Sequence, residues 1–282
     1  MTGAAGPDAP AARSRREYDE NKETGVVNLE GKRVIVTGCA SGIGASAVKA
    51  LVRAGAEVAA LDLSDEAGRA VAADASAAGP GVAHYFSCDV SRKDQVDEVF
   101  RSAVTRLGGL DALINIAGVE RKAPAEAVTQ DDWDLMFDVN ARGTLNTNQA
   151  AFAWLREHGG RIVNFASAAG VMGVPGLAHY SASKAAVLGW TRTAAKEWGK
   201  YGIAVNAVAP AMWTPMYEKF RARLDSAQLA AHDAMMAQQV PLGGRLGDPD
   251  KSMAPVLVFL VSDGANFITG QTLAVDGGLM IP

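Results

Sequence analysis

The sequence contains few of the residues that build disulfide frameworks or metal sites. Only two cysteines, Cys39 and Cys88, and four scattered histidines occur among 282 residues. These are too few for a disulfide scaffold or a four-cysteine zinc site, and the histidines lack ligand spacing. We therefore expect no metal and a reducing, cytoplasmic compartment. We expect both cysteines to be small buried fillers, because no basic neighbour favours a reactive thiolate.

The sequence also lacks a strong excess of either charge. Its 27 Lys and Arg residues against 31 Asp and Glu residues give a formal net charge of -4. Nucleic acids and anionic membranes are bound by clustered cations, so we expect neither as a partner. The first 28 residues contain no apolar run long enough for a signal-peptide core or a membrane span, and we predict a flexible tail over 1–28.

Short apolar runs alternate with Ala-rich stretches of helical spacing from Lys32 onward. Runs this short and continuously apolar are typical of strands buried on both faces, and the segments around 43–54, 91–107, 131–156 and 179–200 are long enough for helices. The pattern predicts an α/β fold, a single-domain Rossmann-like doubly wound parallel sheet of about seven strands with helices on both faces. The predicted strands are RVIVTG, EVAALD, VAHYF, LDALINIAG, GRIVNFAS, IAVNAVAP and QTLAVDGG.

The chain after the tail shows no repeat and no second composition regime. We therefore predict one catalytic domain over 29–282. The segment of about 212–246 interrupts the alternation and is dense in Met, Gln and Ala. This segment is expected to be a substrate-loop insertion that covers the site, or simply a helical surface hairpin.

A glycine-rich turn follows the first predicted strand and opens the first predicted helix. Its spacing is G-x-x-x-G-x-G, so backbone amides and the helix dipole can face a pyrophosphate. The turn therefore predicts binding of a dinucleotide cofactor. The residues assigned to this contact are Gly38, Ser41, Gly42, Ile43 and Gly44.

Asp62 ends the second predicted strand, where a carboxylate accepts hydrogen bonds from the ribose hydroxyls of adenosine. A 2′-phosphate would be repelled there, and neither Ser41 nor Leu63 supplies a compensating cation. We therefore expect NAD rather than NADP, with Asp62 and Leu63 beside the adenosine. The alternative for Asp62 is an exposed turn residue.

Tyr180 and Lys184 lie four residues apart in YSASK, at the start of a predicted helix, and so share a face. A neighbouring ammonium favours the phenolate, so Lys184 is expected to bring the pKa of Tyr180 toward neutrality and make it a general acid or base. A solvated helix pair is the alternative for these two residues alone.

Several motifs occur in one order: TGxxxGIG, NIAG at 115–118, VN at 139–140, Ser167, YxxxK at 180–184 and the closing FITGQTLAVDGG. Together they resemble the short-chain dehydrogenase/reductase family over about residues 29–282. The resemblance implies that Ser167 hydrogen-bonds the substrate oxygen and Tyr180 transfers the proton. It also implies that Lys184 holds the nicotinamide ribose and that Asn140 supports a water in a proton relay.

The resemblance implies further cofactor contacts: Asp89 and Val90 would contact the adenine. Asn115, Ala117 and Gly118 would support the cofactor ribose and the fourth strand. Asp89 has a competing role, because with Ser91 it could start the following helix.

The sequence departs from the family pattern at two places. Ile116 replaces a common second Asn that mainly braces the sheet. After Pro210 the chain has Ala211 rather than Gly, and Thr214 lies four residues past the Pro rather than five. We still expect Pro210, Trp213 and Thr214 to contact the nicotinamide side.

An apolar substrate pocket is expected around Ser167 and Tyr180, with an unliganded core patch as the alternative. His179 is expected to be a surface histidine, because adjacent helix positions point about 100° apart. The remaining tryptophans should pack at helix–sheet or subunit contacts. The residues assigned to the pocket are Met172, Val174, Trp213, Met216 and Tyr217, with Ser167 and Tyr180.

These observations predict an NAD-dependent oxidoreductase that interconverts a small secondary alcohol and a ketone. The alternatives are a 3-oxoacyl thioester (acyl carrier protein) reductase, which Asp62 argues against, and a catalytically idle nucleotide-binding scaffold. The family resemblance implies a homotetramer or homodimer formed through the helices around 131–156 and 179–200.

Overall fold

The structure is a computed structural model that describes residues 27–281. The tail predicted over 1–28 lies outside these residues except for its last two positions. Val27 already packs against the hydrophobic core, and the neighbouring Leu29 is fully buried.

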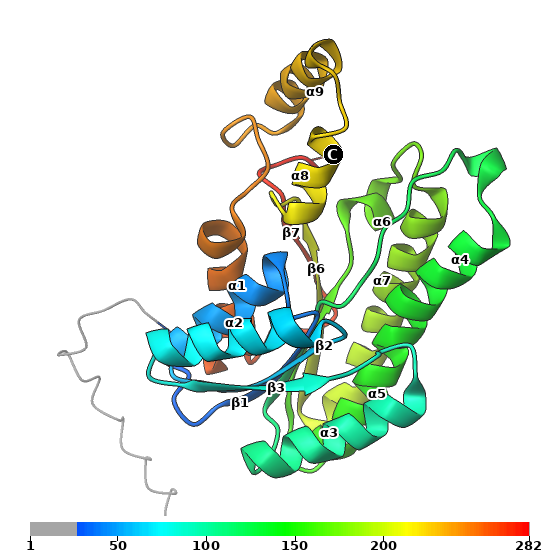
Figure 1. The fold of residues 1–282 in the computed structure, drawn as a ribbon. Helices are drawn as coiled ribbons and strands as arrows, with labels where there is room; N and C mark the ends of the chain where they lie inside the picture. Colours follow the sequence, from blue (N-terminus) through cyan, green and yellow to red (C-terminus); the bar gives the residue numbers. More distant parts are fainter. Residues whose placement is uncertain (1–26, 282) are drawn as a thin grey trace, which may run out of the picture.

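A seven-stranded parallel sheet forms the centre of the molecule, in the order β3-β2-β1-β4-β5-β6-β7 (Figure 1). Each predicted apolar run contains one of these strands, so the predicted fold class is confirmed. The chain crosses from one side to the other between β3 and β4, which places the switch point between β1 and β4. The strands are β1 (Arg33–Thr37), β2 (Glu57–Asp62), β3 (Val82–Ser87), β4 (Ala112–Asn115), β5 (Gly160–Phe165), β6 (Ile203–Pro210) and β7 (Thr272–Val275).

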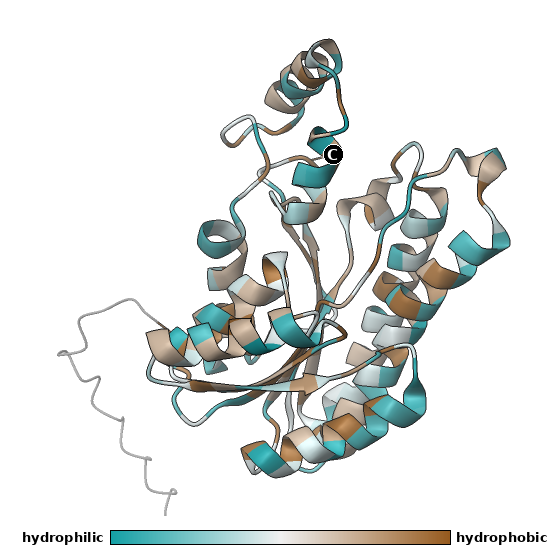
Figure 2. Ribbon diagram, viewed as in Figure 1, coloured by the Kyte–Doolittle hydropathy of each residue, from teal (hydrophilic) through white to brown (hydrophobic). Residues whose placement is uncertain are grey.

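Helices cover both faces of the sheet because alternate strand residues point to opposite sides. Val34 and Val36 of β1 join the core under α1 (Gly42–Arg53), α2 (Asp65–Ala78) and α10 (Ala254–Val261). Ile35 joins the core under α3 (Lys93–Leu107), α5 (Gly143–Leu155) and α7 (Ala178–Trp198). Figure 2 shows the same division, with brown or pale strands inside and teal gathered on the helices.

The long helix predicted around 131–156 is interrupted. It consists of α4 (Gln130–Met136), a π-helical turn η2 (Phe137–Arg142) and α5. The π-turn follows no propensity break in the sequence. It contains the buried Asn140, and π-turns are frequent at functional sites.

The segment predicted as a lid forms two helices, α8 (Pro215–Arg221) and α9 (Ser226–Gln239), which stand beyond the carboxyl end of the sheet (Figure 1). The short helix α6 (Ala168–Met172) lies at the same end. No helix within residues 27–281 has the length and apolar character needed to cross a membrane. The remaining short elements are η1 (Ala125–Ala127), η3 (Gly199–Tyr201), η4 (Pro249–Met253) and η5 (Asp263–Ala265).

Candidate active site

The glycine-rich turn between β1 and α1 is built so that only glycine fits at key positions. Gly38 and Gly42 have positive φ values of 73° and 53°. A Cβ on Gly38 would lie 2.8 Å from the backbone nitrogen of Ala117, and a Cβ on Gly44 would overlap the carbonyl oxygen of Gly38. Since the turn also opens the 12-residue helix α1, its amide end fits a pyrophosphate, as expected for a dinucleotide.

Asp62 at the end of β2 is joined to the glycine-rich turn. Its carboxylate accepts hydrogen bonds from the backbone nitrogens of Ala40 at 2.9 Å and Ser64 at 3.0 Å. The neighbouring Leu63 is exposed. The Asp62 side chain is therefore fixed by hydrogen bonds at the carboxyl end of the sheet, where ligands bind in such folds, and is not a freely exposed turn residue.

Asp89 forms a local turn with Ser91 but does not cap α3, whose N-cap is Arg92 without a side-chain hydrogen bond. The Asp89 carboxylate accepts a hydrogen bond from the backbone nitrogen of Ser91 at 2.9 Å and another from the Ser91 hydroxyl at 2.7 Å, just before α3. Asn146 of α5 donates to the carbonyl of the buried Val90. The adenine contacts of Asp89 and Val90 stay predictions.

A buried hydrogen-bond network braces the carboxyl end of β4. The hydroxyl of Thr37 donates to Asn115 at 2.9 Å and accepts from the nitrogens of Ile116 and Ala117. Asn115 in turn donates to Thr144 of α5 at 3.0 Å. Ile116 packs against the hydrophobic core, which explains how the chain accommodates this departure from the family pattern.

Ser167, Tyr180 and Lys184 converge beyond the end of β5. Ser167 begins α6, and its hydroxyl accepts from the nitrogen of Ala169 at 3.1 Å. Lys184 is buried, and its Nζ donates to the carbonyl of Phe165 at 2.9 Å. Nζ lies 5.9 Å from the centre of the Tyr180 ring. The helix α7 thus positions Tyr180 and Lys184 on one face, as the four-residue spacing predicts.

The expected shift of the tyrosine toward neutrality is wrong for this structure. Burial raises the pKa of Tyr180 to about 12; interaction with the Ser167 hydroxyl opposes this, and the charge of Glu120 adds to it. Lys184 does not compensate because its pKa lies below that of Tyr180, so the amine is neutral at the pH where the phenol would ionise. Burial also lowers the pKa of Lys184 to about 8.

Asn140 lies in the π-turn next to the catalytic-type residues. Its side chain accepts from the nitrogen of Val119 at 2.8 Å and donates to the Val119 carbonyl and the Ser183 hydroxyl, each at 3.0 Å. A Cβ on Gly118 would lie 3.0 Å from Asn140 Oδ1 and 3.2 Å from Lys184 Nζ, so glycine allows the chain to pass close to both side chains. The water-relay role of Asn140 stays a prediction.

The loop after β6 returns to the glycine-rich turn. A Cβ on Gly42 would lie 3.6 Å from Pro215 and 3.8 Å from Thr214, and the Thr214 hydroxyl begins α8 by accepting from the nitrogen of Tyr217. The loop therefore closes over the cofactor end despite Ala211 and the shortened spacing from Pro210. The nicotinamide contacts of Pro210, Trp213 and Thr214 stay predictions.

The residues assigned to the substrate pocket lie on α6, the turn after it and the start of the lid. Met172, Val174 and Met216 are exposed. Trp213 packs edge-on against Tyr217 at 5.1 Å, and the Tyr217 hydroxyl lies 2.6 Å from His232 Nε2. Met172, Val174 and Met216 are therefore apolar side chains exposed at the carboxyl end of the sheet, not part of a buried core patch.

His179 is not a surface residue, and that expectation was wrong. Its side chain is fully buried, and neither ring nitrogen has a hydrogen-bond partner within the described residues. It points inward because α7 packs against α4 as well as against the sheet. The cysteine expectation is confirmed, since Cys39 and Cys88 are buried and burial raises each thiol pKa to about 12.

Two residues near the site, Glu120 and Lys122, were missed. Glu120 raises the pKa of Tyr180, and the Lys122 Nζ lies 3.5 Å from the centre of the Phe220 ring on α8. No motif identifies them. Their place just beyond the fourth strand, at the edge where ligands bind in such sheets, was the available signal.

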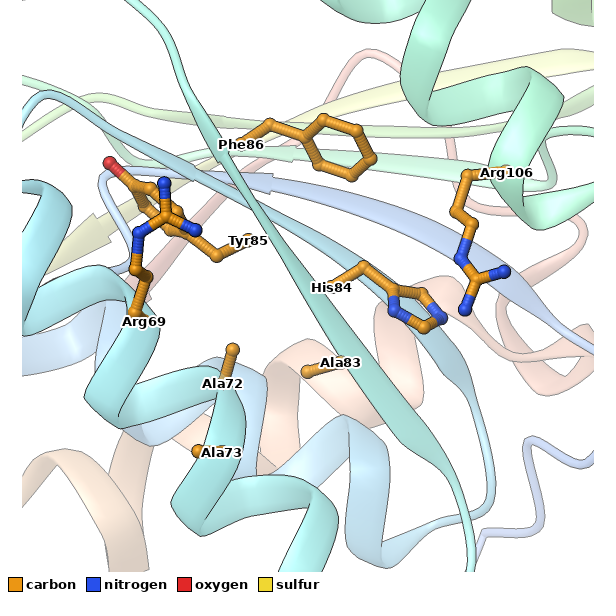
Figure 3. Close-up of a pocket in the computed structure, with 8 residues that line it drawn as sticks. All are labelled: Arg69, Ala72, Ala73, Ala83, His84, Tyr85, Phe86 and Arg106. Carbon is orange, nitrogen blue, oxygen red and sulfur yellow. The ribbon is translucent and has the colours of Figure 1, made fainter.

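Two hollows lie outside the group formed by Ser167, Tyr180 and Lys184. One, at the outer edge of β3, has a volume of about 570 Å³ (Figure 3). The other, of about 1140 Å³, lies behind the lid between Met212, Trp213 and the segment 274–278. No group of three metal-ligating side chains occurs within residues 27–281. The first hollow is lined by Arg69, Ala72, Ala73, Ala83, His84, Tyr85, Phe86 and Arg106.

Comparisons with known proteins agree with this geometry. Residues 38–280 match a family model described as enoyl-(acyl carrier protein) reductase. The chain is 38% identical over 257 residues to 3-oxoacyl-[acyl-carrier-protein] reductase FabG of Thermotoga maritima, covering 90% of this chain and 100% of the relative. It is 40% identical over 255 residues to 2,5-dichloro-2,5-cyclohexadiene-1,4-diol dehydrogenase of Sphingobium indicum, covering 89% and 98%.

A solved structure is also similar. A putative short-chain alcohol dehydrogenase from Sinorhizobium meliloti superposes with a TM-score of 0.84 at 35% identity, over 90% of this chain and 98% of that one. The chain belongs to the short-chain dehydrogenase/reductase family of oxidoreductases.

Proposed function

We propose that this protein is an NAD-dependent oxidoreductase that interconverts a small secondary alcohol and a ketone. The observation that carries the proposal is the convergence of Ser167, Tyr180 and Lys184 beside the glycine-rich turn. A nicotinamide cofactor, when bound, supplies or accepts the hydride. The protein contributes orientation of the substrate and a positioned proton donor or acceptor.

In ketone reduction, the Tyr180 hydroxyl donates its proton to the carbonyl oxygen as the hydride reaches the carbonyl carbon, and Ser167 hydrogen-bonds the same oxygen. The raised pKa of Tyr180 keeps the donor protonated at neutral pH. Oxidation reverses these transfers, so it needs the phenolate as the base. Lys184 would hold the nicotinamide ribose, and Asn140 fixes the chain at Val119 beside it.

Asp62 supports NAD as the cofactor. Its carboxylate is held at the end of β2 by two backbone amides. Neither Ser41 in the glycine-rich turn nor the exposed Leu63 after Asp62 is a cation that would offset repulsion of a 2′-phosphate. The T. maritima relative gives the second candidate, a 3-oxoacyl thioester reductase.

The decisive experiment follows NADH absorbance with purified protein, NAD or NADP, and a panel of secondary alcohols and ketones, beside a 3-oxoacyl thioester. We expect turnover with NAD and its loss in Tyr180→Phe. Faster reduction of the thioester with NADPH would instead support the second candidate. Full activity in Tyr180→Phe would overturn the proposed chemistry.

We further propose a cytoplasmic homotetramer or homodimer built on α5 and α7. The α7 surface exposes small residues at Ala185, Ala186 and Gly189, which allow close helix approach, and α5 exposes Trp154. Light scattering on the eluted protein tests this. A monomer at micromolar concentration would contradict it, and Gly189→Arg should dissociate the oligomer.

A further inference from the structure

Within residues 27–281, the outer edge of β3 has no partner strand. β3 is the last strand of the sheet, so one row of its backbone N–H and C=O groups points away from β2. The hollow of about 570 Å³ lies along this edge, between α2 and α3 (Figure 3). Free edges bind other chain segments, and proteins usually cover them. The edge of β3 is therefore a surface on which a further segment can dock.

The hollow presents positive charge on both sides of β3. On one side, the guanidinium of Arg69 on α2 lies 5.2 Å from the centre of the Tyr85 ring. On the other, Arg106 of α3 lies near His84 (Figure 3); burial and the Arg106 charge lower the pKa of His84, while Glu57 opposes this. The lining contains no carboxylate, and neither arginine forms an ion pair within the described part of the chain. A segment with carboxylates on both of its faces would match these charges.

The chain enters the described structure close to the amino end of β3. The Leu29 nitrogen donates to the carbonyl of Ala54 at 2.7 Å. Two residues further on, the carbonyl of Ala56 accepts from the nitrogen of Val82, the first residue of β3, at 3.2 Å. The residues before Val27 therefore join the molecule where β3 begins, and a segment led back along β3 from there would run antiparallel to it.

The sequence 17–23, EYDENKE, has the charge and the length that this edge requires. It contains four carboxylates and one lysine, and it has no proline that would prevent backbone pairing. Seven residues of extended chain cover about 23 Å, and the six residues of β3 cover about 20 Å. Three residues, 24–26, are left to connect the edge to Val27. Because a tether this short gives an effective concentration of about millimolar, weak contacts suffice for docking.

We propose that the outer edge of β3 is a docking site for the acidic segment 17–23 of the same chain. Antiparallel pairing that sets Glu23 opposite Val82 sets Asn21 opposite His84. Residues opposite each other share a face, so the same register sets Glu23 on the face of Arg106 and Glu20 on that of Arg69. The docked segment covers the free edge and keeps it from pairing with a second copy of the chain.

A disulfide between the segment and the edge tests the register. Asn21→Cys combined with His84→Cys in the full chain should form an internal crosslink on mild oxidation, because opposite residues lie close enough. The natural cysteines, Cys39 and Cys88, are buried. Arg101→Cys, on the exposed surface of α3, replaces His84→Cys in the control and should crosslink at least about tenfold more slowly. A crosslink between two chains would assign the edge to a second copy, and equal rates in both pairs would show no docking; either overturns the proposal.

A nitroxide label on Asn21→Cys tests the charges without altering β3. We expect a broad, immobilised spectrum for the full chain at low salt and a narrow one at 1 M salt, where the screening length is about 3 Å. Arg106→Glu should also narrow the spectrum, and Glu23→Arg added to it should restore part of the broadening. Arg101→Glu is the matched control and should keep the broad spectrum. A narrow spectrum at low salt without the Arg106 change would leave the edge to another partner and overturn the proposal, as would a broad spectrum in Arg106→Glu.

Discussion

The sheet edge and the lid meet at the same site but are held together in different ways. At the sheet edge, Asn115 is buried and bonded to both Thr37 and Thr144. In the lid, Arg221 pairs with Asp233, whose side chain is 52% exposed, and the Arg221 guanidinium lies 4.8 Å from the centre of the Trp213 ring.

This difference separates a rigid part of the site from one that can move at low energetic cost. Breaking a buried hydrogen bond so that its partner is left unpaired costs about 1–3 kcal/mol. An exposed ion pair contributes only about 0–1 kcal/mol. We therefore propose that the sheet edge holds the cofactor and the proton donor in place, while α8 and α9 move to admit and cover the substrate.

The largest effect is expected at the rigid part. Tyr180→Phe removes the proton donor and should lower kcat by about 10²–10⁴-fold while NADH binding, followed by fluorescence, is unchanged. In the wild type, oxidation should rise with pH, because the base is the phenolate and the pKa of Tyr180 is raised. Tyr201→Phe, on the half-exposed tyrosine of η3, should be silent. An equal loss in both variants would contradict the role of Tyr180.

Gly44→Ala should damage the same rigid part without touching a reacting group. The added methyl group would overlap the carbonyl oxygen of Gly38, so the turn must shift and NADH binding should be lost or weakened more than tenfold. Gly199→Ala is the matched control, because a Cβ there meets nothing within 4 Å and its φ is -56°. Titration with NADH checks both variants. Normal binding by Gly44→Ala would place the cofactor elsewhere.

Asp62→Ala should change cofactor choice rather than the chemical step. Losing a hydrogen bond to a charged group costs about 1.5–3 kcal/mol, so the NAD-to-NADP ratio of kcat/KM should fall by at least about tenfold. The exposed Asp74→Ala on α2 is the control. A wild-type enzyme that already prefers NADP would show that the Asp62 argument is wrong.

The smallest effect is expected in the lid. Lys122→Ala removes the contact with Phe220, and an exposed cation–π contact is worth about 0.5–1 kcal/mol. KM should therefore rise about two- to fivefold with kcat and the thermal midpoint nearly unchanged. A drop in kcat larger than the change in KM would show that Lys122 belongs to the rigid part.

Local sequence patterns predicted the strands of the sheet, the glycine-rich turn and the pairing of Tyr180 with Lys184. The apolar run of β6 could be recognised because both faces of a central strand are buried, and the glycine-rich turn because its steric demand is local. Tyr180 and Lys184 followed from helix periodicity. These features depend on neighbours in sequence, which a single chain displays directly.

Features set by tertiary contacts could not be predicted. The burial of His179 depends on α4 packing across α7, which its position beside Tyr180 does not reveal. The pKa of Tyr180 depends first on its burial, and Lys184 does not oppose the rise because burial lowers its own pKa to about 8.

The π-turn at 137–142 joins α4 to α5. Within it, Asn140 holds Val119, and one turn later Thr144 holds Asn115. A π-turn holds one residue more than an α-turn, so deleting Ala141 would return the segment to a regular α-helix while α4 and α5 kept their relative orientation. The contact of Asn140 with Val119 depends on the widened turn, so the extra residue is tied to that contact, although the exposed side chains of the helix are free to vary.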